Sequence, residues 1–338
     1  MPAAGYSLQT GFAVVVSANA AFYTEKHHLP DAKVSSILSS LTYSQYSQII
    51  FPIQSSIWLK KDKYNIITDW RYLQYPSTTF GLGGRSNINN GYTIDFSYIK
   101  IHQTVLKSIT KDLFAGIGYY YDHFWNVREV TPPPNVITDF QKYGLTKTVT
   151  ASGPAFRLLY DSRINQINPT QGWYGNIIYR PNFTFMGSDA NWQSLLIEAR
   201  KYIHFPSASN NVLAFWSYNW LTVGGKPPYL LLPSTGWDDF YNTGRGYIQG
   251  RYRGRDMVYF ETEYRFGITN NGLIGGVVFA NAQSFSSELY KQLNIIAPGY
   301  GVGIRIKVNK FSATNLCVDY GFGVEGSKGI SVNLGEVF

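Results

Sequence analysis

The sequence predicts an all-β protein, a transmembrane antiparallel β-barrel. Polar and apolar residues alternate with a period of two along most of the 338 residues, which is typical of strands that face lipid on one side and water on the other. Aromatic residues make up 17% and charged residues only 15% of the chain, whereas soluble proteins carry about 25% charged residues. No apolar run is long enough for a transmembrane helix. A chain of this kind that spans a membrane must therefore close its sheet.

The alternation continues to the end of the sequence. The last expected strand covers residues 329–338 and places Ile330, Val332 and Phe338 on one lipid-facing side. Glu336 falls on the same side, where a charge is tolerated only near an interface. Fifteen segments of this kind can be assigned along the chain, and single-chain bacterial barrels have even strand numbers. We therefore expect sixteen strands, with one strand of the first third still unassigned.

Aromatic residues gather near the ends of several expected strands. Phe124, Trp125 and Trp216 are examples. Barrels place such residues at the two membrane interfaces. We therefore expect these residues near the membrane interfaces.

The whole chain, residues 1–338, is expected to form a single barrel domain, because the strand pattern begins by residue 10. The first residues, Met1 to Gly5, have neither the basic start nor the apolar core of a secretory signal. We expect the sequence to begin after a removed signal. The long connections 76–91, 127–146 and 223–253 are of a length at which loops are usually functional or disordered.

Several classes of function are disfavoured. The net charge is +8, but Lys and Arg are scattered, so no nucleic-acid partner is expected. The five histidines nowhere share a ligand spacing with Cys or carboxylates. Nothing places a nucleophile beside a base. We expect no metal, no cofactor and no enzymatic activity, and membrane lipid as the surrounding partner.

Three segments carry a more specific pattern. One lies in the long connection and precedes the expected strand Tyr259 to Phe266, in which the period of two puts Glu261 and Glu263 on the lumenal side. The second is a turn near residue 162, and the third is the last strand, where glycines weaken strand propensity. Their residues are Arg245, Gly246 and Tyr247 in the loop, Asp161 and Arg163 in the turn, and Gly329, Gly335 and Phe338 in the last strand.

In this order and at these distances from the C-terminus, the three segments resemble the BamA-type outer-membrane assembly and translocation superfamily (bacterial surface antigen barrels), which includes the two-partner-secretion translocators. The resemblance covers residues 150–338 well and the first 150 weakly. It implies that the loop folds back into the barrel lumen and that Arg245 pairs with Glu263. It also implies that Asp161 and Arg163 form hydrogen bonds at a periplasmic turn.

The chain departs from the family pattern at two points. The second acidic partner of the loop arginine is replaced by Asn281, which brings no charge and implies a loop that is held less firmly or differently. Family members usually carry periplasmic POTRA domains that receive client proteins, and none is expected here. The resemblance is therefore closest to members reduced to the barrel, and it implies a separate periplasmic or lipoprotein partner.

The resemblance implies a place in the bacterial outer membrane and a role in inserting, translocating or presenting outer-membrane polypeptides. Weak pairing between the first and last strands would expose an edge that templates an incoming strand. Two alternatives stay open. A scaffold barrel would bind partner proteins without inserting clients, and a passive diffusion pore would use the water that a sixteen-stranded barrel can enclose.

Overall fold

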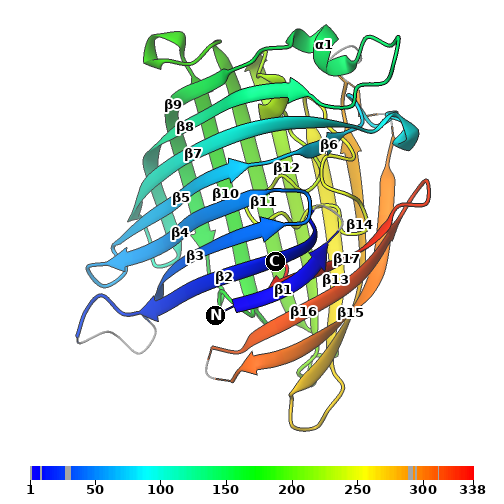
Figure 1. Cartoon of the computed structure of the whole chain (residues 1–338). Coiled ribbons are helices and arrows are strands. Elements are labelled where there is room, and N and C mark those ends of the chain that lie inside the picture. Colours follow the sequence, from blue (N-terminus) through cyan, green and yellow to red (C-terminus); the bar gives the residue numbers. More distant parts are fainter. Residues whose placement is uncertain (1, 8–9, 27–31, 288–291, 294, 311) are drawn as a thin grey trace.

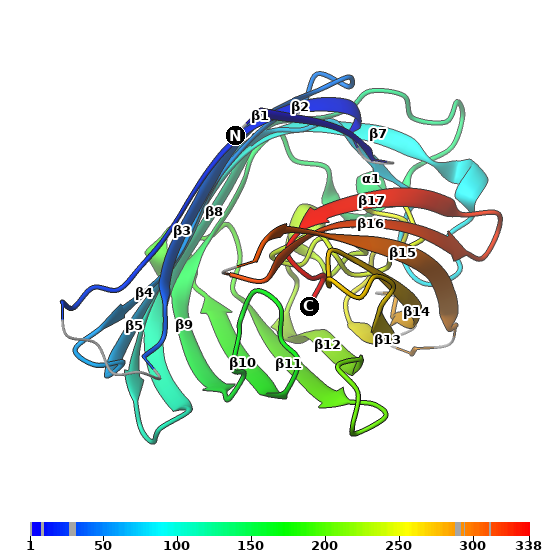
Figure 2. The ribbon, with the colours of Figure 1, turned by 90° about the horizontal axis from the view of Figure 1, so that it is seen from below.

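The computed structural model describes residues 2–7, 10–26, 32–287, 292–293, 295–310 and 312–338. A single sheet of antiparallel strands curls around a lumen (Figure 1, Figure 2). The strands are β1 (Pro2–Ser7), β2 (Gly11–Phe22), β3 (Ser35–Ser44), β4 (Ile49–Leu59), β5 (Tyr64–Gln74), β6 (Ser77–Thr79), β7 (Tyr92–Ser108), β8 (Leu113–Glu129), β9 (Val149–Asp161), β10 (Gly172–Asn182), β11 (Trp192–His204), β12 (Val212–Gly225), β13 (Met257–Gly267), β14 (Ile274–Phe285), β15 (Ala297–Asn309), β16 (Thr314–Gly323) and β17 (Lys328–Leu334).

The strands pair in chain order from β1 to β17. Because β5 and β6 both pair with β7, they share one position, and the seventeen strands occupy sixteen places. This confirms the expected number. The strand missing from the sequence pattern is β1, whose residues Pro2–Ser7 do not alternate. β1 contacts β17, and among the described residues no hydrogen-bonded register joins these two strands. We call this line of contact the seam.

The two ends of the barrel differ in the length of their connections. Short connections such as residues 60–63 and 109–112 lie at one end, which we call the turn end. Long connections lie at the other, which we call the loop end; they include the short helix α1 (Asp139–Gly144) and the 3-10 turns η1 (Ile88–Asn90), η2 (Thr184–Met186) and η3 (Tyr229–Leu231). No described helix has the length and hydropathy to cross a membrane.

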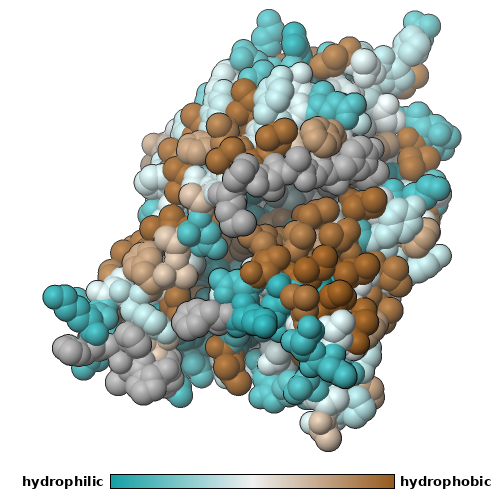
Figure 3. Space-filling view, turned by 60° about the horizontal axis from the view of Figure 1, so that its bottom comes forward, coloured by the Kyte–Doolittle hydropathy of each residue, from teal (hydrophilic) through white to brown (hydrophobic). Residues whose placement is uncertain are grey.

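Exposed side chains on the outside of the sheet are mostly apolar. Figure 3 shows hydrophobic residues gathered on the outer face and hydrophilic residues toward the two ends. On β15 the outer face carries Tyr300, Val302 and Ile304, each more than half exposed. The expected period of two therefore separates a lipid-facing side from a lumenal side.

Two of the three aromatic residues named in the sequence analysis point into the lumen. Phe124 and Trp216 are buried on the lumenal side, with 2% and 1% exposure. Trp216 donates a hydrogen bond from its indole nitrogen to Glu198 on β11 at 2.9 Å. Trp125 lies against Tyr72 with ring centroids 6.2 Å apart. The alternation of each strand decides which aromatic residue points outward, and adjacent residues such as Phe124 and Trp125 point to opposite sides.

The expected last strand is too long. β17 ends at Leu334, and Gly335 has a φ of +95°, a conformation that glycine adopts without steric cost. The chain then turns into the lumen. Glu336 was expected on the lipid side, but its carboxylate accepts a hydrogen bond from Arg305 at 2.9 Å. Phe338 was also expected there, yet its ring stacks on Trp216 at 5.2 Å.

The inward turn of the tail can be tested by truncating Phe338. Phe338→Ala is expected to lower the free energy of unfolding by about 3–5 kcal/mol, because it leaves a cavity among packed lumenal rings. Leu334→Ala is the matched control; Leu334 is 59% exposed on the outer face, where lipid refills the vacated space, so its effect should be smaller. Urea unfolding in detergent micelles measures both. An equal or larger effect at Leu334 would contradict the lumenal position of the tail.

Candidate functional site

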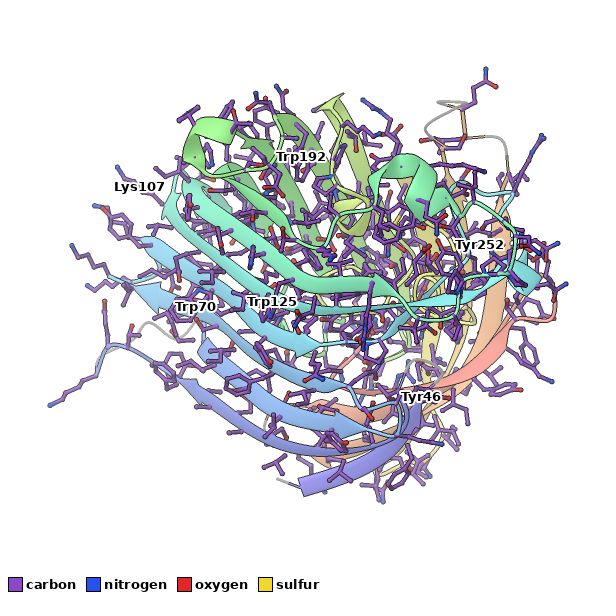
Figure 4. All side chains as sticks on the ribbon, turned by 45° about the horizontal axis from the view of Figure 1, so that its top comes forward. Tyr46, Trp70, Lys107, Trp125, Trp192 and Tyr252 are labelled. Atoms are coloured by element: carbon purple, nitrogen blue, oxygen red, sulfur yellow. The ribbon has the colours of Figure 1, made fainter. Side chains whose placement is uncertain are left out.

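The connection between β12 and β13, residues 226–256, enters the lumen and lies beside β13 to β16 (Figure 2). Its two arms are joined by hydrogen bonds, among them Thr235 N to Tyr252 O at 3.0 Å and Gly254 N to Pro233 O at 3.0 Å. Figure 4 shows Tyr252 among the side chains that fill this part of the lumen. The loop is therefore an ordered hairpin inside the barrel, in the position that the resemblance implied.

Arg245 lies at the centre of a buried ionic cluster. Its guanidinium donates to Glu263 at 2.5 Å, to Glu261, and to Asp319 at 2.8 Å. The Arg245 side chain is only 3% exposed. The guanidinium also lies 3.7 Å above the ring of Phe279. Planar guanidinium groups suit such multiple contacts with carboxylates and rings. The contact expected with Glu263 is present, and two further carboxylates join it.

Asn281 plays a different part from the one that the sequence suggested. Its side-chain nitrogen donates to the backbone carbonyl of Arg245 at 3.0 Å. The missing negative charge comes from Asp319 on β16. The sequence pattern implied a loop held less firmly or differently, and the contacts of Arg245 and Asn281 show that it is held differently. Asp319 lies at a buried inner position of β16, but a contact between β16 and the loop has no local signature in the sequence.

Two further arginines complete the cluster. Arg265 pairs with Glu263 at 2.5 Å, and Arg305 pairs with Asp319 at 2.5 Å. Arg305 also reaches Glu336 of the tail. Each of the four carboxylates therefore has an arginine partner. Buried charges are tolerated when their hydrogen-bonding capacity is met in this way.

Gly246 and Tyr247 bring the loop against β15 and β16. Gly246 has a φ of +98°, and a Cβ there would lie 2.7 Å from the carbonyl oxygen of Phe322. A larger residue would push the loop away from β16. The Tyr247 hydroxyl donates to Pro298 O at 2.5 Å and accepts from Val324 N at 3.0 Å. Each residue of the Arg-Gly-Tyr segment thus makes its own contact with the wall.

A second anchor holds the tip of the loop against the opposite wall. Asp239 accepts from Lys100 of β7 at 3.0 Å, and its backbone carbonyl accepts from Arg71 of β5 at 2.5 Å. The Arg71 guanidinium also lies 5.0 Å from the ring of Tyr241. We call these contacts the tip anchor. The sequence pattern did not predict the tip anchor, although Arg71 and Lys100 lie at lumenal positions and Asp239 lies in the long connection.

The residues expected at the seam lie close to the loop. Gly329 pairs with Gly321 of β16. A pocket separates the loop from β17; it is lined by loop residues 241–247 and by Gly329, Ile330 and Ser331. The backbone carbonyl of Phe338 accepts from Arg265 at 2.9 Å. Gly335 and Phe338 therefore belong to the inward-turned tail, while Gly329 belongs to the seam strand.

Asp161 and Arg163 form a separate cluster at the turn end. Arg163 makes two hydrogen bonds to the Asp161 carboxylate, at 2.9 and 3.0 Å. The ammonium of Lys33 donates to the Asp161 backbone carbonyl at 2.7 Å, and burial lowers the pKa of Lys33. These contacts tie the β9–β10 turn to the β2–β3 connection. In the described part of the chain, no three His, Cys, Asp or Glu residues form a group that could hold a metal.

The Arg245 cluster predicts a strong effect of one substitution. Arg245→Ala should lower the free energy of unfolding by about 3–5 kcal/mol, because it leaves buried carboxylates without their cation. Arg128→Ala is the control: Arg128 is 72% exposed and pairs with Asp95, and such surface pairs contribute about 0–1 kcal/mol. The temperature at which the folded band disappears in electrophoresis measures both. Equal temperatures for the two variants would contradict the central role of Arg245.

Comparisons with known proteins agree with this architecture. Residues 36–338 match the model of the Omp85 superfamily domain, whereas no curated protein matches the sequence significantly. BamA from Haemophilus ducreyi lacking POTRA domains 1–3 superposes with a TM-score of 0.62 at 14% identity, over 98% of this chain and 69% of that one. CdiB from Acinetobacter baumannii superposes with a TM-score of 0.57 at 13% sequence identity, over 98% of this chain and 58% of that one. CdiB from Escherichia coli superposes with a TM-score of 0.61 at 9% sequence identity, over 98% of this chain and 61% of that one. The chain is therefore an outer-membrane β-barrel that belongs to the Omp85 superfamily.

Proposed function

We propose that this barrel helps to insert, translocate or present outer-membrane polypeptides, with the seam between β1 and β17 as the working edge. An unpaired strand edge offers a row of backbone donors and acceptors that can template an incoming strand. No covalent chemistry is required. The observation that carries the proposal is the buried Arg245 cluster, which holds the loop in the lumen directly beside the last strand.

The lengths of the seam strands support this proposal. β1 has 6 residues and β17 has 7, whereas β7 and β8 on the far wall have 17 each. A short strand can form few backbone hydrogen bonds with its neighbour, so separating β1 from β17 costs less than separating β7 from β8. Gly329 weakens β17 further, because glycine in a strand has no side chain to pack.

Reconstitution in liposomes tests the proposal. A urea-unfolded outer-membrane barrel protein is diluted into liposomes that contain this protein, and its folded, protease-resistant band is followed over time. We expect faster folding than in liposomes that contain an unrelated small barrel, and a loss of the difference with Arg245→Ala, because the loop then leaves its place beside β17. Equal folding rates with both barrels would refute the insertion activity.

A separate periplasmic or lipoprotein partner is part of the proposal. The turns at the turn end, such as residues 60–63 and 109–112, are short. They offer little surface for an unfolded client, since a specific interface buries about 800 Å² on each partner. Gentle solubilisation followed by mass spectrometry should recover a partner with the barrel. Recovery of the barrel alone, together with client insertion by the purified barrel, would rule out the partner.

Two other functions fit the same fold. A scaffold barrel would copurify with a partner but would leave the client folding rate unchanged. A diffusion pore would conduct ions steadily in planar bilayers. The loop argues against a wide pore, because its two anchors place it across the lumen, and only low conductance is expected.

A further inference from the structure

Exposed lysines are unevenly distributed around the turn end of the barrel. The turns 205–211 and 268–273, which lie between β11 and β14, carry no charged residue. The connections of β2 to β8 carry or adjoin five exposed lysines, which we call the lysine arc: Lys26, Lys60, Lys61, Lys63 and Lys107. The turns are therefore cationic at β2 to β8 and uncharged between β11 and β14.

The acidic residues of the same turns do not neutralise the lysine arc. The Glu25 carboxylate accepts a hydrogen bond from the backbone nitrogen of Lys61 at 2.8 Å. The Asp62 carboxylate accepts one from the backbone nitrogen of Lys33 at 2.9 Å, and Asp112 attracts the half-buried ammonium of Lys33. Among the described residues, none of the five ammonium groups of the arc forms an ion pair. Their charge can therefore meet an external anion.

The turn between β4 and β5 adopts a costly backbone conformation where it carries this charge. Lys60, Lys61 and Asp62 have φ values of 53°, 54° and 63°. Glycine or asparagine adopts such left-handed conformations more readily and is preferred in tight hairpins. Two lysines in their place cost stability that glycine would not. The lysines therefore contribute something other than the stability of the turn.

Part of the lysine arc lies on the outer face of the wall. Arg71 on β5 and Lys100 on β7 reach the loop in the lumen. Tyr64 and Lys107 lie seven residues from them on the same strands, so they point outward. They are partners in the β5–β7 register, and the Lys60 ammonium lies 5.6 Å from the centre of the Tyr64 ring. Two lysines thus adjoin one aromatic ring on the face that meets the membrane.

This row of residues lies at the edge of the apolar surface. The next outward-facing row consists of Ile66, Val105 and Ile117, which are partners across β5, β7 and β8. Val105 and Ile117 are 47% and 64% exposed, as expected for side chains in contact with lipid. Lys107 follows Val105 by two residues, near the end of β7 (Figure 4). Its ammonium therefore lies where the hydrocarbon ends and the lipid headgroups begin.

We propose that the lysine arc binds the phosphate groups of anionic glycerophospholipids, such as phosphatidylglycerol, in the leaflet at the turn end. Basic clusters beside membrane-spanning segments attract anionic headgroups. The Tyr64 ring and the lysine stems would pack against the upper acyl region, while the ammonium groups of Lys60 and Lys107 reach the phosphate. The inference concerns the lipid around the barrel and does not rest on the proposed function.

The position of the arc favours lipid over an acidic protein. Lys60 and Lys107 adjoin an outward-facing ring at the edge of the apolar surface, where lipid headgroups are always present. A protein that approached the turn end along the barrel axis would meet the turn residues Lys61 and Lys63 before Lys107, which lies on the side of the wall. Only a ligand within the membrane surface can use both parts of the arc at once.

Lipid selectivity tests the proposal. The barrel is reconstituted in phosphatidylcholine bilayers, and trace spin-labelled phosphatidylglycerol or phosphatidylcholine reports by electron paramagnetic resonance how much of each lipid the protein immobilises. We expect phosphatidylglycerol to be favoured by at least about threefold, because one lysine near the membrane surface favours an anionic lipid by about fivefold. High salt should remove the preference. Equal immobilisation of the two lipids at low salt would overturn the proposal.

Two matched variants locate the site. The combined change Lys60→Gln, Lys61→Gln and Lys107→Gln should abolish the preference. The control, Arg128→Gln, Lys142→Gln and Lys147→Gln, removes the same charge from exposed side chains at the loop end and should keep it. The heat-modifiable folded band in electrophoresis checks that both variants fold. Equal losses of preference would show that net charge alone attracts the lipid and would also overturn the proposal.

Photo-crosslinking of the unaltered barrel gives a readout that no variant can disturb. Phosphatidylglycerol with a photoreactive headgroup should crosslink to peptides that contain residues 60–64 and 105–111. Crosslinks of equal yield at 205–211 and 268–273 would contradict a local site. If the barrel shows no lipid preference, and an acidic protein copurifies with it but not with the Lys60, Lys61 and Lys107 variant, the arc binds a protein and the lipid proposal is wrong.

Discussion

The burial of one guanidinium in the middle of a membrane barrel is the constraint on which the rest of this structure depends. Arg245 is 3% exposed and must meet its hydrogen-bonding capacity from the protein. Its two terminal nitrogens do so with Glu261 and Glu263 of β13 and Asp319 of β16, whereas its Nε has no hydrogen-bond partner among the described residues. These carboxylates in turn need Arg265 and Arg305. The loop, three wall strands and the tail thus belong to one ionic unit whose parts are costly to separate.

The alternation along the strands makes such a unit possible. The large side chains that are exposed on the outer face are mostly apolar, and the charges of the cluster lie at inner positions of their strands. On β13 these positions carry Glu261, Glu263 and Arg265 in succession, all buried. On β2 and β3 they carry no charge at all. The ion pairs of the Arg245 cluster therefore lie at β13 to β16, and the inner positions of β2 and β3 contribute none.

Much of this architecture follows from the sequence. The period of two predicted the barrel, the inward direction of Glu263, and the number of strands once an even count was required. The short strand β1 was missed because Pro2–Ser7 do not alternate. Glu336 and Phe338 were placed on the wrong side because the alternation formally continues past Leu334, and nothing in that pattern shows that Gly335 adopts a left-handed conformation.

The contacts of the loop were predicted only in part. Periodicity assigns each residue to a face, but it does not say which strands lie opposite one another across the lumen. The pairing of Arg245 with Glu263 was expected because the resemblance supplied it. The contacts with Asp319, and those of Asp239 with Lys100, depend on the position of β16 and β7 around the barrel. That position is set by the way the whole sheet curls around the lumen, and no local sequence pattern records it.

The inward-turned tail gives the last strand a mechanical role. Glu336 lies two residues after the end of β17 and forms an ion pair with Arg305. Arg305 also pairs with Asp319, which in turn pairs with Arg245. A pull on β17 at the seam is therefore transmitted through Glu336 and Arg305 to the base of the loop. Because these ion pairs connect β17 to Arg245, we expect a displacement of the seam strand to shift the base of the loop.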